Sequence, residues 1–190
     1  MNISPAGQIV MNQATHFCLL AKYNSRMNRQ LIDAAGTLNE ETLIEDKGAF
    51  FQSILGTMNH ILVGDIFWLR RFYAQQPQRF SELQILNDLP SPTRLDDMLF
   101  DNLSDYAAGR FKLDEGIENW ITSEVTEDDF SGYIAYRNSR GEEHKKSFSE
   151  VLFHLFNHQT HHRGQITTLF SQLDVSVGHT DFIFDIPEWA

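Results

Sequence analysis

The sequence predicts an all-α fold built from four long helices, with a small β-hairpin between the third and the fourth. Four segments carry apolar residues at the three- and four-residue spacing of amphipathic helices, at about residues 8–35, 47–75, 95–123 and 147–173. Residues 131–148 instead alternate and contain the turn sequence Asn-Ser-Arg-Gly, which favours two short strands. A chain of 190 residues can bury a core of its own, so we assign residues 1–190 to a single domain.

Two asparagines interrupt the apolar stripe of the first predicted helix. Asn24 and Asn28 lie four residues apart in the middle of this stripe, and Gly36 follows the last periodic residue, which indicates the helix end. Buried amides are usually satisfied by neighbouring backbone or by water. Alternatively, the two side chains hydrogen bond to a ligand or to the residues that hold it. The sequence leaves both interpretations open.

The second predicted helix is apolar over a wide arc that includes Phe50 and Phe51. His60 points nearly opposite the centre of this arc and has Gly56 and Gly64 one turn to either side. Glycine inside a helix costs about 1 kcal/mol relative to alanine, so this pair suggests that clear space beside His60 is required. A helix with apolar groups on both faces is buried on two sides, which we assign to the bundle and to a dimer interface.

The connections between the first three helices differ in length. A short acidic segment, residues 40–46, joins the first two. Residues 76–94 hold three of the five prolines, which predicts a loop long enough to cross the end of a bundle. The second and third helices therefore need not be antiparallel neighbours. In the third helix Arg110 interrupts the stripe, and we expect its stem to pack while its guanidinium reaches the edge.

The fourth predicted helix carries half of a metal site. Ser147 begins it with a capping-box pattern, and His158 and His162, four residues apart, project from one face. A third ligand must come from another helix, and His60 is the best candidate. Three imidazoles with an open fourth position are typical of catalytic zinc. A metal held in this way lowers the pKa of bound water or of a bound thiol.

Other polar residues near these histidines have less defined roles. His154 lies one turn before His158, and we favour a pocket or core role for it over that of a fourth ligand. His161 points to the other side of His158 and is expected at the surface or behind the ligands. Asp65 lies among apolar residues of the second helix. A buried carboxylate needs a partner, so Asp65 either orients a histidine N–H or has a surface or capping role.

The composition argues against several classes of function. The formal net charge is −11 with histidine neutral, and no basic run offsets it, so we expect no nucleic-acid binding. The single cysteine, Cys18, cannot form a disulfide within the chain, and no apolar run approaches membrane-spanning length. We find no signal peptide, phosphate-binding glycine loop or GxSxG motif. A cytoplasmic protein that does not enter the membrane is the expectation.

Two histidine-containing segments share a pattern with a known family. They read GAFFQSILGTMNHIL at residues 48–62 and NHQTHHRGQ at residues 157–165, and further matching positions are Tyr23, Asn24, Asn28, Asp65, Trp68, Leu69, Thr180 and Asp181. The chain resembles the DinB (DNA-damage-inducible) family over nearly its whole length. The resemblance implies a four-helix bundle of up-down-down-up order, commonly dimeric, with a divalent metal, zinc or nickel, on His60, His158 and His162. The wider superfamily includes thiol S-transferases and isomerases, and the family name implies no DNA contact.

We therefore hypothesise a metal-dependent enzyme of the stress response, of the thiol S-transferase or hydrolase type. It would activate a small thiol or water for attack on an electrophilic small molecule and would form a homodimer. We expect the pocket for a low-molecular-weight thiol cofactor to be lined or tuned by Asn24, Asn28, Asp65 and Gln165. The alternative is a non-enzymatic, metal-stabilised dimeric bundle that acts as a sensor or interaction protein. A bundle with a vacant site and a partner-binding role is a third hypothesis.

Overall fold

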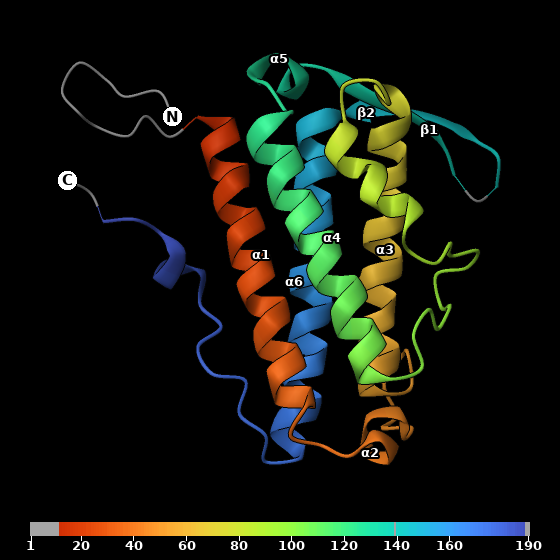
Figure 1. Ribbon diagram of the computed structural model, residues 1–190, viewed down its shortest axis with the longest axis vertical. Helices are drawn as coiled ribbons and strands as arrows, with labels where there is room; N and C mark the ends of the chain where they lie inside the picture. Colours follow the sequence, from red (N-terminus) through yellow and green to blue (C-terminus); the bar gives the residue numbers. More distant parts are fainter. Residues whose placement is uncertain (1–11, 139, 189–190) are drawn as a thin grey trace.

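The computed structural model describes residues 12–138 and 140–188, and most of them are helical. Four long helices lie side by side (Figure 1): α1 (Gln13–Ala35), α3 (Ile54–Gln75), α4 (Leu103–Ser123) and α6 (Phe148–Gln172). In Figure 1 the chain runs downward in α1 and α6 and upward in α3 and α4. Helix α1 packs on α4 and α6, and α3 packs on α6. The prediction of a mainly helical chain is confirmed.

Aromatic side chains fill the upper part of the core, where the long helices meet the hairpin. Phe72, Trp120 and Phe148 are almost fully buried, and the Phe72 ring lies 5.1 Å from Trp120 and 4.8 Å from Phe148 between centroids. Truncation of a buried ring to alanine typically costs about 3–5 kcal/mol. The apolar stripes of α3, α4 and α6 therefore hold these helices in the positions from which the polar side chains described below project.

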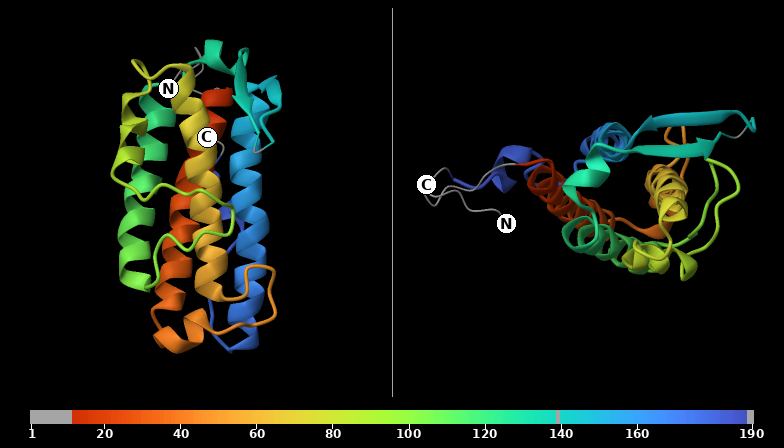
Figure 2. Two further views of the ribbon diagram at one scale, coloured as in Figure 1. Left: turned by 90° about the vertical axis from the view of Figure 1, so that its right-hand side faces the viewer. Right: turned by 90° about the horizontal axis from the view of Figure 1, so that it is seen from above.

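The predicted hairpin is present and antiparallel. Strands β1 (Tyr133–Arg137) and β2 (Glu143–Ser147) pair in register, and a short helix, α5 (Glu127–Phe130), precedes them. Ile134 is fully buried, as expected where alternate side chains of a strand face the core. Seen from above, the hairpin lies beside α6 and α3 (Figure 2). Residue 139, which the predicted turn includes, is outside the described residues.

Helix α3 begins at Ile54, not at about residue 47 as predicted. The Ser53 hydroxyl accepts a hydrogen bond from the Gly56 amide at 2.9 Å and caps the helix. Gln52 has φ of 64°, a left-handed conformation that no α-helix accommodates. Residues 47–53 therefore form a tight turn, and the apolar spacing continued into it only by coincidence. Phe50, which we placed in the apolar arc of the helix, is 87% exposed.

Helix α4 also begins later than predicted, at Leu103, because the Asn102 side chain accepts from the Asp105 amide and caps it. The segment between α3 and α4 contains a 3-10 helix, η1 (Ser81–Asn87), and a loop that crosses α3 (Figure 2). The acidic connection after α1 contains another short helix, α2 (Glu40–Ile44), at the lower end of the molecule (Figure 1).

The ends of the described chain differ in detail from the sequence prediction. Helix α1 is capped by Asn12, whose side chain accepts from the Thr15 amide at 2.9 Å, while residues 8–11 of the predicted helix lie outside the described residues. The tail forms a short 3-10 helix, η2 (Phe182–Asp185), which is tied to α1 by an ion pair of 2.5 Å between Arg26 and Asp185. Across residues 12–138 and 140–188, no helix has both the length and the apolar character needed to cross a membrane.

Candidate metal centre

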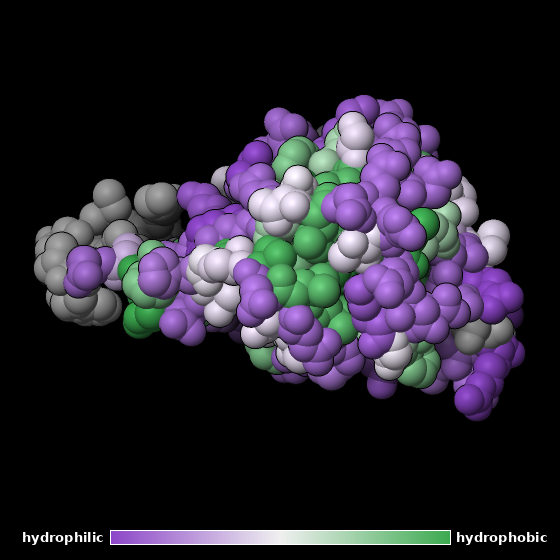
Figure 3. All heavy atoms as spheres, turned by 90° about the horizontal axis from the view of Figure 1, so that it is seen from below, coloured by the Kyte–Doolittle hydropathy of each residue, from purple (hydrophilic) through white to green (hydrophobic). Residues whose placement is uncertain are grey.

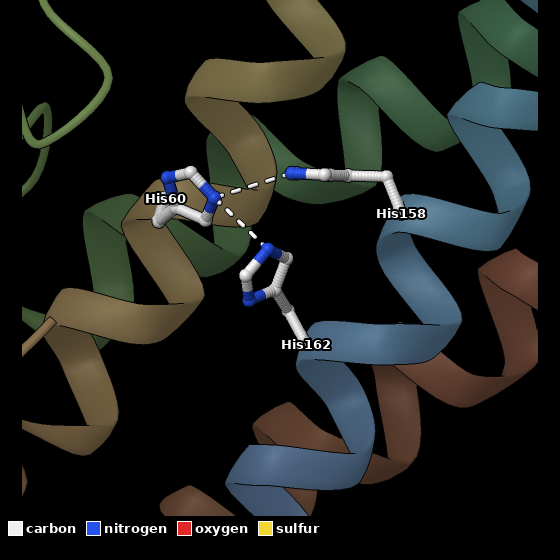
Figure 4. Close-up of side chains that lie close together, drawn as sticks. All are labelled: His60, His158 and His162. Carbon is white, nitrogen blue, oxygen red and sulfur yellow. Dashed lines mark hydrogen bonds between the residues drawn. The ribbon is translucent and has the colours of Figure 1, made fainter. Parts of the chain in front are cut away.

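Three histidines from two helices converge between α3 and α6. His60 projects from α3, and His158 and His162 project from consecutive turns of α6 (Figure 4). The Nε2 atom of His60 lies 3.2 Å from that of His158 and 3.1 Å from that of His162. One ligand atom from each of the three residues lies within 4.8 Å of the others. The structure thus brings together the three predicted metal ligands.

The hydrogen bonds at the other ring nitrogens decide what these Nε2 atoms present to one another. His60 Nδ1 lies 2.8 Å from the carbonyl oxygen of Leu95, which only accepts, so Nδ1 carries the proton. His162 Nδ1 likewise lies 2.8 Å from Oε1 of Gln165. In the neutral rings both Nε2 atoms are therefore unprotonated, and their lone pairs point at each other. Such an arrangement is repulsive unless a cation lies between the nitrogens.

The spacing of the nitrogens fits a tetrahedral metal ion. Zinc binds imidazole at about 2.0–2.1 Å, which places neighbouring ligand nitrogens of a tetrahedron about 3.3 Å apart. The distances of 3.1 and 3.2 Å from His60 are close to this value. Three protein nitrogens leave the fourth position of such a tetrahedron for water or another small ligand, as in catalytic zinc sites.

The surroundings keep the three imidazoles in the neutral form that binds metals. Burial, followed by the nearby histidines, lowers the pKa of His158 to about 3. Burial also lowers the pKa of His60 and of His162, although the hydrogen bonds to Leu95 and Gln165 act in the opposite direction. His60 is 5% exposed, whereas His158 and His162 are partly exposed.

Gly64 leaves space for the imidazole of His158, not for that of His60 as we predicted. A Cβ atom at Gly64 would lie 2.8 Å from Cε1 of His158, closer than real Cβ contacts allow. At Gly56 a Cβ atom would meet the carbonyl oxygen of Phe51. The space beside His60 is instead filled by Phe51, whose ring stacks on the imidazole with centroids 3.7 Å apart and planes 15° apart. The two glycines therefore serve His158 and the turn before α3.

Sequence reasoning missed the groups that orient His60. Leu95 contributes its backbone carbonyl from a loop, and no side-chain pattern reveals such a role. The sequence analysis noted Phe51 but placed it in the apolar arc of the second helix, whereas α3 begins three residues later, at Ile54. His154 and His161 lie beside the ligands, with ring centroids 6.0 Å from His158 and 4.8 Å from His162 respectively. Both are largely exposed, and neither belongs to the set of three whose nitrogens converge.

The four residues predicted to line or tune the pocket fall into two groups. Gln165 is exposed and contacts His162 directly. Asn24, Asn28 and Asp65 are buried in a network of polar side chains behind the histidines. Both asparagines donate to the Asp114 carboxylate, at 3.2 and 3.0 Å, so a side chain of α4 accepts from both amides. A contact of any of the four with a thiol cofactor remains a prediction.

Arg110 lies at the centre of this network, which corrects our expectation that its guanidinium reaches the edge. It is fully buried and pairs with Asp65 at 2.5 Å and with Asp114 at 2.8 Å. Its guanidinium stays inside because one carboxylate from α3 and one from its own helix pair with it there. Burial raises the pKa of Asp65 to about 6, opposed by Arg110. Asp65 has its partner in Arg110, so neither a surface nor a capping role applies, and among the described residues no histidine N–H donates to it.

The network is connected to the metal centre through the helix that carries two of its ligands. Gln159 and Arg163 directly follow His158 and His162 on α6 and are both buried. Arg163 donates to Oε1 of Gln159 at 3.1 Å and to the Asn24 side chain. Two carboxylates and two guanidiniums balance in charge, as a buried polar cluster requires. The cluster thereby holds the rotation of α6 relative to α1 and α4.

Comparison with known proteins agrees with this geometry. The sequence model described as "DinB family" matches residues 11–189. The chain belongs to the DinB family. Within that family it is 24% identical over 166 residues to Protein DinB of Bacillus subtilis (strain 168), an alignment that covers 86% of this chain and 89% of that protein. In the chain described here, the residues that match the family model include all three converging histidines.

Proposed function

We propose that this chain is a divalent-metal-binding protein of the stress response, and that its metal form is an enzyme that activates a small thiol or water. His60, His158 and His162 would hold the ion. When bound, the metal lowers the pKa of a coordinated thiol or water and so supplies a nucleophile near neutral pH. A thiol S-transferase or hydrolase reaction on an electrophilic small molecule is the class of chemistry that this predicts.

The chain's own residues have separate tasks in this proposal. The Leu95 carbonyl and the Gln165 side chain fix the ring orientation of His60 and His162 by accepting their Nδ1 protons. Burial keeps the imidazoles neutral, so they do not need to release a proton before binding the ion. The partly exposed edges of His158 and His162 leave a path for a small molecule to the open position.

One observation carries the proposal: the Nε2 atoms of His158 and His162 converge on that of His60, at 3.2 and 3.1 Å. The test is the metal content of the purified protein after exposure to Zn²⁺ and removal of excess ion. We expect one ion per chain in the wild type and almost none in His158→Ala. His154→Ala, one turn away on α6, is the matched control and should retain the ion. Equal metal content in His158→Ala and the wild type would overturn the ligand assignment.

Several finer features belong to the same proposal. Imidazole ligands suit both zinc and nickel, and we propose one of these as the native ion. The directions of the four long helices support a four-helix bundle of up-down-down-up order. We further propose a homodimer, a low-molecular-weight thiol as cofactor with Asn24, Asn28, Asp65 and Gln165 near it, and no binding of nucleic acid to a chain of net charge −11.

A non-enzymatic function is the second candidate, and a specific feature favours it. The three histidines join α3 to α6, so a bound ion would cross-link two long helices of the fold. The metal would then stabilise a dimeric sensor or interaction protein. Metal removal distinguishes the two functions, because loss of a structural metal lowers the melting temperature sharply. A catalytic ion on the same histidines also stabilises the folded chain by mass action, so the result that favours the enzyme is a turnover that is lost with the metal and returns with it.

A further inference from the structure

Two loops contact His60, and each carries an exposed apolar side chain next to the contact. Phe51, which stacks on the imidazole, is preceded by Phe50, which is 87% exposed. Leu95, whose carbonyl accepts the Nδ1 proton, has a side chain that is 60% exposed. An exposed Phe normally gains free energy from burial, on the order of 1.5–3 kcal/mol when complete. An apolar ligand that covered these two side chains would therefore bind favourably.

The backbone holds Phe50 in its exposed position. The Gln52 amide donates to the Ala49 carbonyl at 2.8 Å, and the Lys47 amide donates to the Gln52 carbonyl at 2.8 Å. This turn requires the left-handed φ of 64° at Gln52, which is strained for a residue other than glycine. Strain of this kind persists where the neighbouring contacts enforce it. Here the turn places the Phe51 ring against His60 and leaves the Phe50 ring exposed to solvent.

The rings form a continuous series that begins at the metal ligands. Phe51 lies face to face with His60 and edge to face with His162, at a centroid distance of 5.6 Å. Phe50 contacts Phe51 edge to face at 4.8 Å. The lower end of the molecule, where α2 lies, shows an apolar area surrounded by hydrophilic residues (Figure 3). The exposed ring is thus an extension of the candidate metal centre, not an isolated surface residue.

We propose that Phe50, Phe51 and Leu95 bind the apolar part of the small molecule whose reactive group occupies the open metal position. The inference rests on the proposed metal site and adds the class of ligand: a molecule with a metal-binding head and an aromatic or similarly apolar tail. Aromatic contacts add specificity because ring pairs prefer defined edge and face arrangements. Phe50 and Leu95 determine specificity in this proposal and do not take part in the chemistry.

The test uses the full chain loaded with Co²⁺, whose visible spectrum reports a ligand entering the open position. Two probes share a head group: 1-methylimidazole and 1-benzylimidazole. Wild-type protein should bind the benzyl probe more tightly, and Phe50→Ser should reduce this preference about three- to tenfold, the ratio expected for one aromatic contact. Binding of the methyl probe should not change. Phe184→Ser, at an exposed ring of the tail, is the control and should behave as wild type.

Different failures have different meanings. An equal preference for the benzyl probe in Phe50→Ser and wild type overturns the inference. The inference is also overturned if Phe50→Ser changes the oligomeric state in sedimentation but leaves the preference for the benzyl probe unchanged. The Phe50 ring would then contact another copy of the chain instead of the small molecule. If the wild type does not bind Co²⁺, or if 1-methylimidazole does not change the Co²⁺ spectrum, the metal site itself is overturned. The inference, which rests on that site, is then overturned as well. Leu95→Ser gives a second, independent measurement of the same preference.

Discussion

Replacing Gly64 by alanine should change the stability of helix α3 and the metal affinity in opposite directions. A Cβ atom at this position would lie 2.8 Å from Cε1, 3.2 Å from Nδ1 and 3.6 Å from Nε2 of His158. Favourable carbon contacts begin at about 3.5 Å, so the ring must withdraw by about 0.7 Å. Metal sites tolerate changes of only about 0.2 Å in ligand distance. The substitution should therefore damage metal binding directly.

The magnitude follows from the cost of overpacking. Extra atoms in a filled site typically cost about 1–3 kcal/mol, which corresponds to roughly a 5- to 150-fold loss of metal affinity if His158 must return to its place to bind. Helix propensity acts in the opposite direction, because alanine is favoured over glycine by about 1 kcal/mol. The metal-free variant should thus be nearly as stable as the wild type while it binds metal much less tightly.

The assay is a competition titration with a chromophoric zinc chelator, combined with the melting temperature of the metal-free protein. Gly164→Ala is the matched control, since it is the same substitution in a long helix where, apart from its chain neighbours and the nearby helix backbone, nothing lies within 4 Å of the added Cβ. We expect this control to be slightly stabilised and to bind zinc as the wild type does. Equal zinc affinity in Gly64→Ala and Gly164→Ala would refute the argument that Gly64 creates the space for His158.

Three further outcomes are expected. Gln165→Leu removes the acceptor of His162 Nδ1 and should weaken metal binding about 10-fold or more with little effect on stability, because Gln165 is exposed; unchanged affinity in a chelator titration would contradict this. Asp65→Asn leaves Arg110 with one buried charge partner instead of two and should cost about 3–5 kcal/mol in urea unfolding, and a cost below about 1 kcal/mol would contradict the role of the pair. The metal-free protein should lose stability as the pH falls from about 6.5 to about 3, because the unfolded chain then binds a proton at His158 that the folded chain, with its lowered pKa, does not. Unfolding monitored across this range should show a smaller slope in His158→Ala, and an identical slope would argue against this assignment.

The amino-acid sequence by itself determined the helices and the ligand types. Apolar spacing repeats over enough turns to predict four long helices, because burial of one stripe is a local consequence of the 3.6-residue period. The four-residue interval between His158 and His162 places both imidazoles on one face of any helix that contains them. His60 was chosen as the third member because it lies opposite its own apolar arc and between two glycines, and the resemblance to the DinB family implied the same residue. Each of these inferences depends on neighbours along one helix.

The tertiary structure decided the contacts between segments that are distant along the chain. The start of α3 depended on the left-handed conformation of Gln52, which apolar spacing cannot distinguish from a helix turn. Leu95 reaches His60 through a backbone carbonyl, a group that every residue carries. Arg110 was assigned to the edge because arginine usually packs its stem and extends its charged end to water, and only the folded chain brings the Asp65 carboxylate to it. Partners that come together only on folding leave no periodic signal, and so the space at Gly64 was assigned to the wrong histidine.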